Sequence, residues 1–165
     1  MHKVKLTYKV LYDKAHHQHN AEDWIDWALE MMDAGYESEH LFILAGMPLS
    51  SNRFELDVII NKTLKELSLD KSSHKEIINS YIYYLASEAL EGKLPTATVL
   101  DKLRDLCRDK NYDEQLLPFY LLAFAREDLK EQGVQFYWEG ADQSNIDFII
   151  REKLSELKNH YQKPK

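Results

Sequence analysis

The chain has 165 residues, of which 44% are hydrophobic and 30% are charged, values typical of a folded globular protein rather than a disordered one. The formal net charge of −7 argues against a general nucleic-acid binder, because such proteins need cationic surface to displace counterions from phosphate. A single cysteine, Cys107, excludes an internal disulfide and a zinc site built from several cysteines. The longest apolar run, Leu116–Ala125, has ten residues, whereas a membrane-spanning helix needs about 20. We therefore expect a single cytoplasmic domain spanning residues 1–165, with no membrane or nucleic-acid partner.

The first half of the chain has the spacing and boundary residues of four helices. Asn20, Ser38 and Asn52 are residue types that cap helix N-termini, and Gly35 stands where a left-handed residue ends a helix. The third helix contains the sequence LFILA, which is apolar on every side and should therefore be buried centrally. The expected helices run from Lys3 to about Ala15, from Asn20 as N-cap to Gly35, from Glu39 to Ala45, and from Asn52 as N-cap to about Leu67.

The second half predicts four more helices, separated by short polar segments. Pro118 lacks a backbone donor, so the seventh helix either kinks there or begins near Leu117. The expected helices begin at Ser72 or Ser73, after Thr96 as N-cap, between Glu114 and Leu117, and at Ser144, and the last ends near Tyr161. The inward face expected for the sixth helix consists of Val99, Leu100, Leu103, Leu106 and Cys107. All five glycines fall at the inferred boundaries, which agrees with the helical periodicity. The predicted fold is all-α, with seven or eight helices packed as antiparallel pairs in an irregular superhelix or a globular bundle.

The second helix carries an unusual charge pattern. Residues 1–20 have a net charge of +3, whereas residues 21–60 have a net charge of −8. Asp23, Asp26, Glu30 and Asp33 are spaced three and four apart, so they share one side of this helix, opposite an apolar face. That face consists of Trp24, Ile25, Trp27, Ala28, Leu29, Met31 and Met32.

Local structure explains only part of this acidity. Glu22 and Asp23 are favoured by the dipole at the helix N-terminus, whereas Asp26, Glu30 and Asp33 gain nothing from it. These three acids either pair with lysines of the first helix or form a surface for an electropositive partner protein.

A second candidate surface is the segment 134–143, VQFYWEGADQ, which interrupts the helical periodicity. Three adjacent aromatic residues cannot all face the core from one segment. We expect an aromatic loop in which Tyr137 and Trp138 contact a partner, since both residue types are common interface anchors. The alternative is a loop folded back to cap the core.

The residues also offer one candidate metal site. His16, His17 and His19 lie just before the acids of the second helix, and imidazole with carboxylate suits zinc, iron or nickel. However, neighbouring histidines point apart on a helix, so a polar turn is the simpler interpretation. We predict no cofactor, no metal ligand and no catalytic residue, because the chain has no nucleotide-binding, hydrolase or metalloprotease motif.

The sequence therefore favours a non-catalytic protein–protein interaction module. A concrete form is an acidic inhibitor or immunity-type protein that binds a basic partner through Asp26, Glu30 and Asp33, with Tyr137 and Trp138 as further contacts. The alternative is a metal-binding protein or metal-dependent hydrolase that uses the histidine cluster. Self-association is a third hypothesis.

Overall fold

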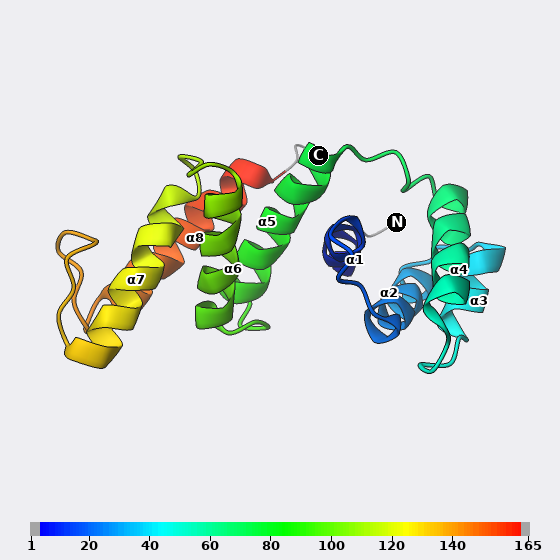
Figure 1. Ribbon diagram of the computed structural model, residues 1–165, viewed down its shortest axis with the longest axis horizontal. Helices are drawn as coiled ribbons and strands as arrows, with labels where there is room; N and C mark the ends of the chain where they lie inside the picture. The colour runs from blue at the N-terminus through cyan, green and yellow to red at the C-terminus, as the bar shows by residue number, and fades with distance from the viewer. Residues whose placement is uncertain (1–3, 163–165) are drawn as a thin grey trace. The chain divides into compact units, whose positions relative to one another are not determined.

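The computed structural model describes residues 4–162, and those residues form eight α-helices and no strand (Figure 1). The predicted all-α fold is confirmed. The contacts divide the chain into two compact units, Met1–Tyr81 and Ile82–Lys165, and α5 contains the boundary. Within the described residues, no helix is both long enough and apolar enough to cross a membrane. The helices are α1 (Leu6–Ala15), α2 (Ala21–Asp33), α3 (Glu39–Ala45), α4 (Arg53–Glu66), α5 (His74–Leu90), α6 (Thr96–Asp109), α7 (Leu117–Gln132) and α8 (Ile146–Tyr161).

Side-chain caps fix the starts of three helices in the first unit. Asn20, Ser38 and Asn52 each accept a hydrogen bond from a backbone N–H three residues later, at 2.9, 3.1 and 2.9 Å. These bonds satisfy donors that the first turn leaves without a partner, as the sequence predicted. Gly35 has a φ of +87°, a conformation that favours glycine, and it ends α2. The predicted start of the first helix, Lys3, lies outside the described residues.

Two predicted boundaries in the second half were off by one or two residues. Thr96 is the first residue of α6 rather than its cap, and Pro95 holds the N-cap position. Ser144 does not cap α8; instead the Asp142 carboxylate accepts hydrogen bonds from the backbone N–H and the hydroxyl of Ser144, at 2.7 and 2.6 Å. The expectation for Pro118 was correct, because α7 begins at Leu117, where the missing donor costs no helical bond.

The core of the first unit lies around two tryptophans. Trp24 and Trp27 are fully buried, and their rings meet edge to face with centroids 5.1 Å apart. α3 packs against both α2 and α4 and buries Leu41 and Leu44 on that side. The expectation that α3 is buried on every side was wrong: Phe42 and Ile43 are 50% and 43% exposed. Its neighbours cover one side of this seven-residue helix and leave the other side to solvent.

The second unit follows its predicted pattern more closely. α7 packs against α6 and α8, the helices that precede and follow it in sequence (Figure 1). The inward face predicted for the sixth helix is buried as expected, and it consists of Val99, Leu100, Leu103, Leu106 and Cys107. Burial, and then the charge of Asp113, raise the pKa of the Cys107 thiol, which fits an unreactive core residue.

Candidate functional site

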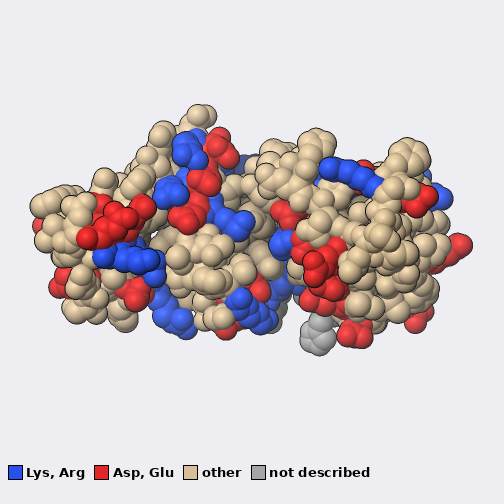
Figure 2. Space-filling view, turned by 60° about the horizontal axis from the view of Figure 1, so that its bottom comes forward, with Lys and Arg blue, Asp and Glu red and all other residues tan. Residues whose placement is uncertain are grey.

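The outer side of α2 is acidic. Glu22, Asp26, Glu30 and Asp33 are all exposed, and their spacing of three and four residues keeps them on one side of the helix. No ion pair within residues 4–162 joins Asp26 or Asp33 to a basic side chain. Figure 2 shows acidic side chains gathered beside uncharged surface on the half of the chain that contains α2.

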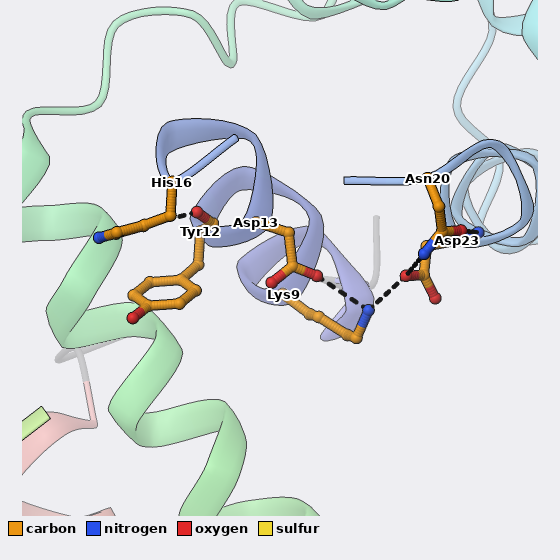
Figure 3. A network of polar contacts seen from close by, with 6 residues as sticks. All are labelled: Lys9, Tyr12, Asp13, His16, Asn20 and Asp23. Atoms are coloured by element: carbon orange, nitrogen blue, oxygen red, sulfur yellow. Dashed lines mark hydrogen bonds and ion pairs between the residues drawn. The ribbon is translucent and has the colours of Figure 1, made fainter. Parts of the chain in front are cut away.

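Asp23 differs from the other acids because a lysine of α1 neutralises it. Lys9 Nζ lies 2.6 Å from Asp23 Oδ2 and 2.9 Å from Asp13 Oδ2, so it bridges α1 and α2 (Figure 3). Asn20 completes the network, because its amide donates to the same Asp23 oxygen at 2.7 Å. Burial by itself would lower the pKa of Lys9, but the hydrogen bonds to Asp23 and Asp13 outweigh it and raise that pKa. Pairing with the first helix therefore explains Asp23 but not Asp26 or Asp33.

The acidic side of α2 also carries an exposed leucine. Leu29 was predicted to lie on the buried face, yet 47% of its surface is exposed. It follows Asp26 by three residues and precedes Asp33 by four, so it lies among the exposed carboxylates. The buried face of α2 consists of Trp24, Trp27, Ala28 and Met31, and Leu29 points away from it. We call Asp26, Leu29, Glu30 and Asp33 the α2 stripe.

The three histidines before α2 do not meet. The His16 ring stacks on Tyr12, and its Nδ1 is 2.8 Å from the Tyr12 carbonyl oxygen. His17 is exposed and adopts a φ of +56°. His19 is 5% exposed, and its Nε2 lies 2.7 Å from Asp57 Oδ1 of α4. These contacts hold the turn between α1 and α2.

A metal ion would need several of these side chains at one point. No group of three or more His, Cys, Asp or Glu side chains in the described part of the chain has an arrangement that could hold one. The buried His19 is fixed to α4, whereas His17 faces solvent, so the cluster predicted as an alternative metal site supplies no converging ligands.

The aromatic segment forms a loop, as predicted, between α7 and α8. Tyr137 stacks on Phe124 of α7, with ring centroids 5.3 Å apart, and retains 45% exposure. Trp138 is partly buried. The residue that faces solvent most fully is Phe136, at 94% exposure, and it was not among the predicted contact residues.

One side chain organises this loop from within. The Gln135 amide oxygen accepts hydrogen bonds from the backbone N–H groups of Tyr137 and Trp138, each at 2.8 Å. Its nitrogen donates to the carbonyl oxygens of Trp138 and Ala141, at 2.6 and 2.8 Å. With all four contacts made, the loop holds Phe136 outward in a defined conformation, a property of preorganised binding loops.

These features define two exposed surfaces. One is the α2 stripe in the first unit, and the other is the loop of residues 134–143 in the second unit, which we call the Phe136 loop. Sequence periodicity located both segments. It did not identify Leu29 or Phe136 as their exposed apolar residues, because exposure depends on which neighbours cover a helix or loop. No family model, curated protein or solved structure matches this chain.

Proposed function

We propose that the protein is a non-catalytic protein–protein interaction module that binds a basic partner through the α2 stripe. The observation that supports this proposal is the exposed Leu29 between Asp26 and Asp33. An apolar side chain surrounded by charge of one sign suits a partner that offers an apolar pocket with a basic rim. An inhibitor or immunity-type protein that masks a basic enzyme is a concrete form of this function.

The charges have a definite role in such an interaction. Complementary charge speeds encounter and selects against acidic partners, while the buried apolar contact holds the complex together. The Phe136 loop is a second contact surface in the proposal, with Tyr137 stacked on Phe124 and 45% exposed. Tyr, Trp and Phe are all enriched in the cores of protein interfaces.

Capture experiments with matched charge variants test this proposal. The wild-type chain, the triple variant Asp26→Lys, Glu30→Lys, Asp33→Lys, and a control triple outside both surfaces, Glu114→Lys, Glu131→Lys, Glu152→Lys, are immobilised and exposed to lysate from the source cells. All six positions are exposed, and both triples change the net charge equally. Circular dichroism confirms that each variant is folded.

The proposal predicts a basic protein that the wild type and the control triple retain and that the stripe triple loses. Isolated partner and wild type should then bind in a purified assay, with affinity that falls as salt increases. Equal retention by all three chains would overturn the role of the α2 stripe. Loss by both triples would show that net charge, and not this surface, governs capture.

A further inference from the structure

A pocket of about 310 Å³ opens in the second unit, where the end of α5 and the start of α6 meet α7 and α8. Every residue that lines it follows Tyr81 in the chain, so this pocket is formed by one compact unit alone. Small-molecule sites in proteins begin at about this volume, and most of them combine an apolar lining with a few polar groups. The lining of this pocket has both components.

The apolar part of the lining reaches the core of the unit. Ile150 and Leu154 lie about one turn apart on α8 and are 0% and 2% exposed, yet both line the pocket. Ala89 and Leu90, at the end of α5, supply the rest of the apolar lining. A ligand with an apolar body would cover these side chains and would be favoured there by the hydrophobic effect.

The polar part of the lining carries more positive than negative charge. Arg126 of α7 and Arg151 of α8 line the pocket together with one acid, Asp147. Arg126 Nε lies 3.7 Å from Asp147 Oδ1, which is too long for a hydrogen bond, so this ion pair uses none of the arginine's N–H donors. The Asp147 side chain is 83% exposed, so water screens its charge.

The end of α5 holds Arg151 at the pocket. Arg151 Nη2 donates a hydrogen bond to the Leu90 carbonyl oxygen at 3.2 Å. Leu90 is the last residue of α5, where carbonyl groups have no acceptor role within the helix. A guanidinium group has five N–H donors, and this bond uses one of them. Arg151 is therefore tied to the pocket wall and keeps donors for a ligand.

The start of α6 adds positive potential at the same place. Thr96, the first residue of this 14-residue helix, lines the pocket. Pro95 occupies the N-cap position without a side-chain cap, and the first turn contains no acid that would neutralise the helix dipole. The partial positive charge of the helix N-terminus therefore acts together with the two arginines.

We propose that this pocket binds a small molecule with an oxyanion head, either a carboxylate or a phosphate monoester, on a short apolar chain. Guanidinium groups form paired, charge-assisted hydrogen bonds with both kinds of oxyanion. The head meets Arg126 and Arg151, while the chain covers Ile150 and Leu154. The pocket is separate from the α2 stripe and the Phe136 loop, so this inference goes beyond the proposed function.

Five probes test the chemistry of the ligand. Hexanoate, hexyl phosphate, hexanol and hexylamine share one apolar chain, and acetate retains the carboxylate without that chain. Each probe is titrated into the ¹⁵N-labelled full chain at neutral pH and physiological salt, and the amide chemical shifts of Leu90, Thr96 and Ile150 are followed.

We expect at least one of the two hexyl anions to shift these amides with a dissociation constant of about 1 mM or lower. Hexanol, hexylamine and acetate should each bind at least about tenfold more weakly, because each lacks either the negative charge or the apolar chain. The tighter of the two hexyl anions identifies the head group as a carboxylate or a phosphate.

Single substitutions separate this pocket from general attraction of anions. Arg126→Gln and Arg151→Gln each remove one positive charge from the lining. Arg108→Gln is the matched control, because Arg108 is also exposed and ion-paired with an acid, Asp105, but does not line the pocket. We expect each pocket variant to weaken binding of the tighter anion at least about fivefold, and the control to change it less than about twofold.

Circular dichroism checks that the variants are folded, and Arg151→Gln, at an exposed position, decides the result if Arg126→Gln does not fold. Several results would overturn the inference: no shift of the pocket amides by either hexyl anion at about 20 mM, equal binding of hexylamine or acetate, or equal weakening by the pocket and control variants. None of these results concerns the α2 stripe, so they would leave the proposed function unchanged.

Discussion

The indole N–H of Trp27 donates a hydrogen bond to Thr7 Oγ1 at 2.9 Å and so links α2 to α1 inside the core of the first unit. Both residues are buried. The Thr7 hydroxyl donates in turn to Met31 Sδ at 3.8 Å, so one threonine meets two residues on the inner side of α2. This contact positions α1, which carries Lys9, against α2.

Thr7→Val is expected to lower the free energy of unfolding by about 1–3 kcal/mol, because it keeps the shape of the side chain but leaves the buried Trp27 N–H without an acceptor. Thr63→Val is the matched control. Thr63 is also buried, but its hydroxyl donates to the Ile59 carbonyl oxygen of its own helix, and its loss leaves no buried donor unpaired. Urea unfolding followed by circular dichroism measures both variants. Equal losses would contradict the role of the Trp27 bond.

The Lys9 bridge predicts a stability term that depends on pH. The pKa of Lys9 is raised above its ordinary value of 10.5, so the folded protein holds this proton more tightly than the unfolded chain. The contribution is therefore fully present below about pH 10.5 and is lost as the pH rises through the higher pKa of the folded state.

Lys9→Met should lower the free energy of unfolding by about 1 kcal/mol at neutral pH, since the bridge is partly exposed and solvent screens it. The difference between wild type and variant should be constant from neutral pH to mildly alkaline pH and should shrink above about pH 10.5. Lys62→Met, at an exposed position of α4, is the control for removal of a positive charge. A difference that grows with pH would have the wrong sign and would refute the bridge.

The loop between α7 and α8 should depend on Gln135. Gln135→Ala removes four hydrogen bonds that join the ends of the segment, so the backbone N–H groups of Tyr137 and Trp138 lose their acceptor. We expect these amides to exchange with solvent at least about tenfold faster, which hydrogen-exchange mass spectrometry detects as local opening. Gln132→Ala, at the exposed last residue of α7, should leave loop exchange unchanged. Unchanged exchange in both variants would contradict the role of Gln135, and would leave the loop to the stacking of Tyr137 and to bonds such as that from Gln143 Nε2 to the Leu129 carbonyl oxygen.

Local chemistry made most of the fold predictable from sequence. Asn20, Ser38 and Asn52 cap their helices through bonds that span three residues, so the sequence contains both partners. Periodicity predicted the buried face of α6, because the residues on one side of a regular helix recur every three or four positions in the sequence. The start of α7 near Pro118 follows from the missing donor alone.

The exposed surfaces were harder to predict because they depend on packing between distant segments. An apolar residue such as Phe42 or Phe54 has the same local pattern whether a neighbouring helix covers it or not. Lysines of the first helix were one predicted explanation for Asp26, Glu30 and Asp33. Only the path of the chain shows that Lys9 instead pairs with Asp23, which the helix dipole already explained, and does not reach Asp26. The exposed apolar residues at both candidate surfaces therefore required the structure.

The dipole of α2 predicts opposite effects of an acid-to-lysine substitution at the two ends of the helix. Asp33 is the last residue of α2, where the helix dipole disfavours a negative charge, so Asp33→Lys should raise the free energy of unfolding by about 0.3–1 kcal/mol. Glu22 lies in the first turn, where the dipole favours an acid, so Glu22→Lys should lower it by a similar amount. Both residues are exposed, and both variants change the net charge equally.

Thermal unfolding at low salt and at about 1 M salt measures both effects, and the high salt should diminish them by screening. The same sign for both variants would show that net charge rather than the dipole is responsible. If Asp33→Lys stabilises the fold and also weakens capture of the partner, then the acid at this position opposes stability and serves binding. An interaction surface on α2 requires this combination of higher stability and weaker binding. If the carboxylate had only a structural role, its replacement would lower both stability and binding or would change neither.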